Sequence, residues 1–126
     1  ALGARPMIAR RAGAHVLLSI HLNAFPDGIE PRANAGTGTY FFHPPSAPLA
    51  RHVQAGMVRE LGLRDLGTYY DNLALVRPTW MPSVLCEGAF LMIPEQEAAL
   101  RTPDYQERYA RGVADGVEAW LRTLAR

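Results

Sequence analysis

The chain has 126 residues, with 13 basic and 12 acidic side chains and a net charge of +1. A charge this balanced excludes binding to nucleic acid by charge alone, and no segment approaches the roughly 20 apolar residues of a membrane span. Because 48% of the residues are apolar and 20% are charged, disorder is excluded as well. We expect one folded domain over residues 1–126, present as a monomer.

The first half of the chain predicts a helix, two strands and a long loop. A short helix is expected before Gly13, followed by a strand over residues 16–20 and another over 39–42. The 16 residues from Leu22 to Thr37 contain several turn-forming residues. Loops of this length in compact domains are more often functional than not.

The second half predicts two further strands and three helices. Ser46 is expected to cap a helix whose apolar residues recur at every fourth position until Gly62. Residues 62–72 and 78–82 are predicted to be irregular, and the other elements follow in chain order: strands over 73–76 and 83–86, a helix over 94–100, and a helix that begins after Thr102 and continues to Leu124.

The four predicted strands are almost continuously apolar, which is typical of strands buried on both faces. This pattern predicts an α/β domain with a mostly parallel sheet and helices on both faces. In such sheets, ligands bind at the carboxyl ends of the strands. His21 ends the first predicted strand and Glu87 ends the fourth.

An imidazole and a carboxylate at one sheet edge are typical of zinc-assisted hydrolysis, in which the histidine holds the metal and the glutamate accepts a proton from water. The alternative is structural: a histidine satisfied at a strand end and a carboxylate paired with an arginine. His43 ends the second predicted strand and would reach the same edge if that strand is parallel, although its Pro-rich context favours a turn.

Cys86 is the only cysteine, so an internal disulfide and a cysteine-rich zinc module are excluded. With His21 it would form the nucleophile and base of a cysteine hydrolase. Neighbouring side chains on a strand point to opposite faces, however. If Glu87 faces the site, Cys86 faces the core, and this favours a buried, inert thiol.

Two segments resemble signatures of the zinc-dependent N-acetylmuramoyl-L-alanine amidases of the Amidase_3 type: Ser19-Ile20-His21-Leu22-Asn23-Ala24, and Pro82-Ser83-Val84-Leu85-Cys86-Glu87-Gly88-Ala89-Phe90. The resemblance implies that His21 is a Zn²⁺ ligand and Glu87 the catalytic carboxylate. It implies hydrolysis of the peptidoglycan amide bond between N-acetylmuramic acid and L-alanine. It also makes Asn23 and Arg77 candidate substrate-binding residues, although Asn23 would suit a simple turn and Arg77 could pair with Glu87 instead.

The family has an opening strand that carries a zinc-binding histidine, and a following helix that carries a zinc-binding glutamate. Neither has a counterpart before Ala14. We therefore expect residues 1–126 to be an amidase catalytic domain that lacks its N-terminal part. The expected location is periplasmic, secreted or cell-wall-associated, in a bacterial enzyme or a phage lysin. The alternatives are a non-catalytic cell-wall-binding remnant and a cysteine hydrolase using Cys86.

Overall fold

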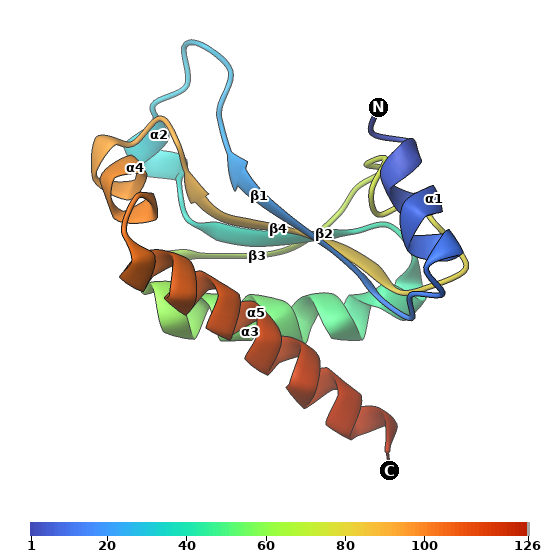
Figure 1. The fold of residues 1–126 in the computed structure, drawn as a ribbon. Coiled ribbons are helices and arrows are strands. Elements are labelled where there is room, and N and C mark those ends of the chain that lie inside the picture. Colours follow the sequence, from blue (N-terminus) through green and yellow to red (C-terminus); the bar gives the residue numbers. More distant parts are fainter. Residues whose placement is uncertain (126) are drawn as a thin grey trace.

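The computed structural model describes residues 1–125 of the chain, which form one sheet with helices around it (Figure 1). Four strands and five helices follow one another, with a 3₁₀ turn over Pro44–Ser46 before the third helix. In chain order the elements are α1 (Ala4–Arg11), β1 (Leu17–Asn23), α2 (Pro31–Asn34), β2 (Thr37–Phe41), α3 (Ala47–Leu61), β3 (Asp65–Tyr70), β4 (Ser83–Phe90), α4 (Pro94–Leu100) and α5 (Pro103–Leu124).

The sheet has the strand order β1-β4-β2-β3. The pairs β1–β4 and β2–β3 are parallel, whereas β2 and β4 are antiparallel. The predicted α/β class with a mostly parallel sheet is therefore confirmed. Since β2 runs against β4, the carboxyl ends of β1 and β4 lie at one end of the sheet and that of β2 lies at the other.

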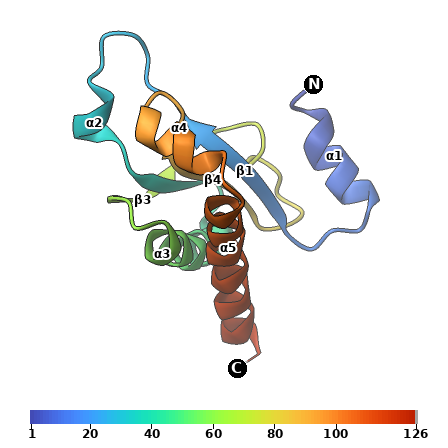
Figure 2. The ribbon, with the colours of Figure 1, turned by 60° about the vertical axis from the view of Figure 1, so that its left-hand side comes forward.

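One face of the sheet is covered by α3 and α5, which lie side by side in both views (Figures 1 and 2). Their apolar sides enclose the main core together with Val84 and Cys86 of β4. The two helices approach backbone to backbone, because a Cβ atom added to Gly56 would lie only 2.0 Å from the carbonyl oxygen of Gly112. Glycine is required at this crossing.

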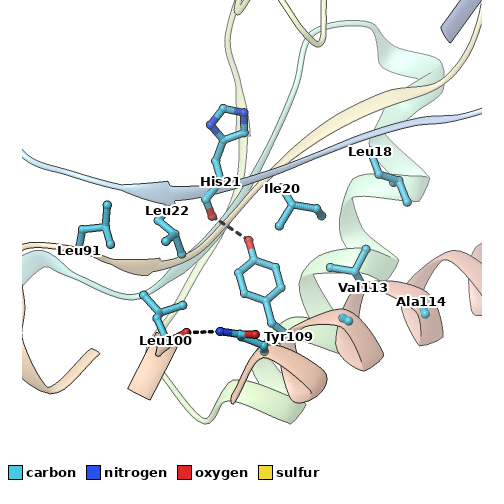
Figure 3. A pocket seen from close by; sticks show the side chains of 11 residues that line it. Leu18, Ile20, His21, Leu22, Leu91, Leu100, Tyr109, Val113 and Ala114 are labelled. Carbon is cyan, nitrogen blue, oxygen red and sulfur yellow. Dashed lines mark hydrogen bonds between the residues drawn. The ribbon is translucent and has the colours of Figure 1, made fainter. Parts of the chain in front are cut away.

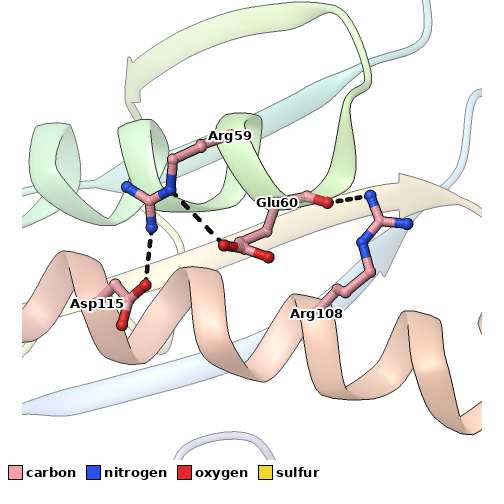
Figure 4. A network of polar contacts seen from close by, with 4 residues as sticks. All are labelled: Arg59, Glu60, Arg108 and Asp115. Atoms are coloured by element: carbon pink, nitrogen blue, oxygen red, sulfur yellow. Dashed lines mark hydrogen bonds and ion pairs between the residues drawn. The ribbon is translucent and has the colours of Figure 1, made fainter.

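Polar contacts join the solvent-facing sides of the same two helices (Figure 4). Arg59 of α3 forms an ion pair with Asp115 of α5 at 2.8 Å, and Arg108 of α5 donates to the carbonyl of Glu60 in the last turn of α3. The Arg59–Asp115 pair is solvent-exposed and contributes little stability. Close packing at the glycines therefore fixes how α5 lies beneath the sheet.

The other face is covered differently. Leu75 and Val76, in the loop between β3 and β4, pack against Leu85 of β4 and partly buried side chains of β2. The short helix α1 lies on the same side as this loop, away from the α3–α5 layer (Figure 2). Helices therefore flank the sheet on both sides, but a loop supplies most of the contact on the second side.

The strand predicted over residues 73–76 is wrong, because these residues form a turn. Their apolar character reflects burial of the loop against Leu85. The third strand is instead β3, within the stretch predicted to be irregular. It lies at the sheet edge, is mostly exposed or half-buried, and contains Gly67 with a positive φ of 81°. These features hide the strand from a search for apolar runs.

The helix predictions are confirmed for α1, α4 and α5, and the Thr102 hydroxyl accepts a hydrogen bond from the Tyr105 amide as expected of a cap. Gly62 ends α3 in the left-handed conformation. Ser46 does not cap α3; its hydroxyl accepts a hydrogen bond from the Ser83 amide instead. Within residues 1–125, no helix combines the length and the apolar character needed to cross a membrane.

Candidate active site

The register between β1 and β4 brings His21 and Glu87 together. They are direct Cα partners on adjacent parallel strands, so their backbones are roughly 5 Å apart and their side chains point to the same face. This face is the one opposite α3 and α5, because Cys86, the neighbour of Glu87, lies in the core on the helix side. The prediction that the two residues lie close together agrees with this geometry, but neither residue ends its strand, because β1 continues to Asn23 and β4 to Phe90.

The Glu87 carboxylate is only partly exposed, and its Oε2 atom is buried without a hydrogen-bond partner. Burial raises the pKa of Glu87 from an ordinary 4.5 to about 7. A carboxyl group with a pKa near neutrality can both accept and return a proton at physiological pH. The arginine partner considered in the sequence analysis is not among the contacts of Glu87 in the described residues.

His21 is oriented by a neighbour on the same strand. Its Nε2 atom lies 2.8 Å from the hydroxyl oxygen of Ser19, which is two residues earlier and therefore on the same face. Ser19 itself is largely buried. This hydrogen bond orients the imidazole ring on the face that Glu87 shares.

Asn23 is also on this face and interacts with Tyr40 of β2. The pKa of Tyr40 is raised by burial first and then by the nearby Tyr69 and Glu87, whereas a hydrogen bond with Asn23 lowers it. Tyr40 therefore belongs to the site, although the sequence analysis treated it only as part of a strand. No sequence signal identifies it, because its nearness to Glu87 depends on the antiparallel pairing of β2 with β4.

Arg77 and His43 lie elsewhere. Arg77 is not at a strand end: it donates to the Asn72 side chain, and its carbonyl oxygen is 2.5 Å from Nε2 of His43. This contact follows the end of β2, near the start of β4, and is about 13 Å along the strand from Glu87. The structure therefore does not bring Arg77 or His43 to the His21–Glu87 pair. His43 would reach it only if β2 were parallel to β4.

Cys86 does not form a nucleophile pair with His21. Its side chain is 0% exposed in the core on the helix side. Burial, with a smaller contribution from the Glu87 charge, raises the pKa of the thiol to about 12. A thiol that is protonated at neutral pH and faces away from the histidine cannot act as the nucleophile.

A separate apolar groove of about 860 Å³ lies between β1 and α5. In Figure 3, Leu18, Ile20 and Leu22 point into it, whereas the His21 imidazole points to the opposite side of the strand. The groove is therefore not the site of the polar chemistry.

The side chains near His21 include only part of the ligand set that a catalytic zinc ion needs. His21 and Glu87 are donor types that zinc hydrolases use, but a catalytic zinc site takes three protein ligands. Among residues 1–125, no group of three or more His, Cys, Asp or Glu side chains is placed to hold a metal ion. His21 and Glu87, with its unpartnered oxygen, are therefore chemically suited to a zinc site, but two residues are too few to complete one.

Sheet, helix layer and polar pair together define an α/β domain with a candidate site on the sheet face opposite α3 and α5. The family model for N-acetylmuramoyl-L-alanine amidase (Amidase_3) matches residues 1–119. The chain belongs to this family.

Curated proteins similar to this chain include an amidase and a phage endolysin. The amidase LytC of Bacillus subtilis is 29% identical over 114 residues, which cover 90% of this chain and 23% of LytC. The endolysin of Bacillus phage SPP1 is 28% identical over 117 residues, which cover 86% of this chain and 41% of the endolysin. The chain therefore spans less than half the length of these curated relatives.

Solved structures share the fold. The N-acetylmuramoyl-L-alanine amidase of Clostridium difficile 630 superimposes with a TM-score of 0.87 at 33% identity, covering 97% of this chain and 66% of that one. The catalytic domain of CwlV from Bacillus (Paenibacillus) polymyxa var. colistinus superimposes with a TM-score of 0.85 at 34% identity, with the same coverage. The chain thus corresponds to about two thirds of these solved chains.

Proposed function

We propose that the protein hydrolyses the amide bond between N-acetylmuramic acid and L-alanine in peptidoglycan, with Glu87 as general base. The observation that carries the proposal is the direct pairing of His21 with Glu87, whose Oε2 is buried and unpartnered. This places a proton acceptor with a pKa of about 7 beside an oriented imidazole. Family membership supplies the substrate class.

In this proposal His21 is one ligand of a zinc ion. The other ligands are protein groups other than His21 and Glu87. Bound zinc would supply Lewis-acid polarisation of the scissile carbonyl. The Glu87 carboxylate takes a proton from the attacking water and returns it to the nitrogen of the leaving L-alanine. Ser19 keeps the His21 ring in one orientation throughout.

Asn23 and Tyr40 form the side of the site next to Glu87 and are proposed to position the substrate through their amide and hydroxyl groups. The segment from Leu22 to Thr37 is proposed as one wall. It is held at the carboxyl end of β4 by stacking of Phe25 on Phe90, with ring centroids 4.5 Å apart. We also propose that Arg77, which lies farther from Glu87, binds carboxylates of the stem peptide in a more distant part of the substrate.

The reaction is tested by incubating the full-length protein with purified peptidoglycan sacculi and labelling newly exposed amino groups. Hydrolysis leaves L-alanine as the new N-terminal residue of the stem peptide, so detection of this N-terminal L-alanine (alanine release) identifies the bond. We expect Glu87→Gln to lower the rate by about 10²–10⁴-fold, because the general base is lost while shape is kept. The matched control is Glu97→Gln on exposed α4, which should retain the wild-type rate.

The metal role is tested separately by zinc analysis. His21→Ala should lower bound zinc and activity, whereas the exposed His15→Ala should change neither. EDTA should abolish turnover and added Zn²⁺ should restore it. A full-length protein that binds sacculi but contains no zinc and releases no alanine would instead be a non-catalytic cell-wall-binding protein, the alternative considered from the sequence.

The relatives include a protein described as a cell wall amidase and a phage endolysin. We therefore propose that the protein works at the cell wall, whether it is encoded by a bacterium or a phage.

A further inference from the structure

The pairing of β1 with β4 is interrupted directly after His21 and Glu87. The next aligned pair is Asn23 with Phe90, so β4 has two residues, Gly88 and Ala89, where β1 has only Leu22. Such a bulge breaks the regular ladder of hydrogen bonds. The backbone next to the proposed catalytic pair therefore needs another partner.

Tyr109 of α5 supplies that partner. Its hydroxyl oxygen accepts a hydrogen bond from the Gly88 amide at 2.9 Å. The hydroxyl donates to the carbonyl of His21 at 2.9 Å, with the carbonyl of Cys86 at 3.1 Å as a second acceptor. Figure 3 shows the Tyr109 ring rising from α5 to the His21 carbonyl, on the side of β1 away from the imidazole.

The three backbone groups bound by this hydroxyl have one thing in common. One belongs to His21, and the other two belong to the residues on either side of Glu87. We propose that Tyr109 is a positioning residue, whose hydroxyl ties the two strands together from the helix side and thereby sets the separation of His21 and Glu87. The proposal rests on the function proposed above.

The surroundings of Tyr109 suit this role. Its side chain is 5% exposed, and burial raises its pKa well above the ordinary value, so the hydroxyl keeps its proton. A Cβ atom at residue 88 would lie 2.0 Å from the Tyr109 ring, so glycine is needed for the ring to reach the bulge. Gly112, three residues after Tyr109, packs against Gly56 of α3, and this contact anchors this part of α5.

The chain provides a matched control. Tyr105 lies one helical turn before Tyr109 and is equally buried, but its hydroxyl has no hydrogen-bond partner. Tyr105→Phe and Tyr109→Phe therefore remove the same atom from the same helix face. Only the second substitution removes contacts with β1 and β4.

The test compares both variants with the wild-type full-length protein on soluble muropeptides, together with hydrogen exchange of the Gly88 amide followed by NMR. Displacing catalytic groups costs about 10–100-fold in activity when a supporting hydrogen bond is lost. We expect Tyr109→Phe to lower kcat by about 10-fold or more with KM changed less than about twofold. Gly88 exchange should accelerate, while Tyr105→Phe should match the wild type in both measurements.

The role is overturned if Tyr109→Phe keeps kcat within about twofold of the wild type, or if Tyr105→Phe loses as much, since general packing would then explain the effect. If the wild-type protein releases no alanine, the proposed function fails and the exchange measurement decides alone. If the Gly88 amide stays as protected in Tyr109→Phe as in the wild type, Tyr109 does not hold β1 and β4 together. Loss of this protection in Tyr109→Phe but not in Tyr105→Phe would support the proposal.

Discussion

Glu87 combines a buried oxygen that has no hydrogen-bond partner with a position directly beside a histidine on the next strand. A buried carboxylate without a partner opposes folding, because the charged form loses its hydration. Such a cost is typical of groups retained for chemistry. At this position, stability and the proposed catalysis therefore make opposite demands.

Replacing Glu87 by glutamine should stabilise the zinc-free protein in a pH-dependent way. The folded-state pKa of about 7 exceeds the ordinary 4.5, so the wild type loses stability as pH rises between these values. At pH 8, in EDTA, we expect Glu87→Gln to be more stable by about 1–2 kcal/mol, a value reduced for partial solvent exposure. At pH 4 the difference should vanish. Urea unfolding at both pH values measures it, and an equal difference at both would contradict the raised pKa.

Cys86 should be unreactive in the folded protein. Its thiol is buried and has a pKa of about 12. We expect no modification by Ellman's reagent at pH 8 and one thiol per chain in 6 M guanidinium. Cys86→Ala should retain the full rate of alanine release. Loss of turnover with the fold intact would restore the cysteine-hydrolase interpretation.

The crossing of α3 and α5 determines what lies beneath the site. Because glycines meet at this crossing, the two helix backbones approach closely enough for Tyr109 to reach the bulge between β1 and β4. The exposed ion pairs of Figure 4 accompany this crossing but contribute little to its stability. Packing of small residues thus links the helix layer to the polar face of the sheet.

Enlarging the crossing should destabilise the fold. A methyl group at residue 56 would overlap the Gly112 carbonyl, and neither backbone can move independently of its helix. We expect Gly56→Ala to lower the free energy of unfolding by about 3 kcal/mol, despite the better helix propensity of alanine. Gly3→Ala is the control, since a Cβ atom there meets nothing within 4 Å. Equal urea midpoints for the two variants would show that the helices are not in close contact.

The molecule as a whole is asymmetric at its two sheet edges. β3 forms one edge and ends in the exposed Tyr69 and Tyr70, whereas β1 forms the other and presents apolar side chains to the groove beside α5. In the described residues, Ile20 and Leu91 of this region are 55% and 48% exposed. An apolar groove beside an exposed strand edge favours binding of apolar molecules and association with other chains.

Residues 1–126 produced by themselves should therefore bind the dye 1-anilinonaphthalene-8-sulfonate with increased fluorescence. Ala114→Glu, which places a charge in the groove at an exposed helix position, should abolish most of the increase. Ala33→Glu, on exposed α2 and outside the groove, should not. Equal fluorescence from both variants would place the dye elsewhere.

The residue pattern by itself determined the fold class, four of the five helices, three of the four strands, and the nearness of His21 to Glu87 toward one end of the sheet. These features depend on local periodicity and on the rule that parallel strands end together. The signature segments around the two residues also identified the family, which the match over residues 1–119 confirms.

Only the tertiary structure decided the rest. The direction of β2 places His43 away from the site and Tyr40 beside it, because strand direction is set by packing between distant segments. Arg77 lies away from the site because it belongs to the loop between β3 and β4. The apolar run at 73–76 is a buried loop, since burial does not distinguish a strand from a covering turn. The raised pKa of Glu87 comes from its burial in the folded chain, and the Tyr109 bridge joins residues 21 and 88 positions apart in sequence, which no local pattern encodes.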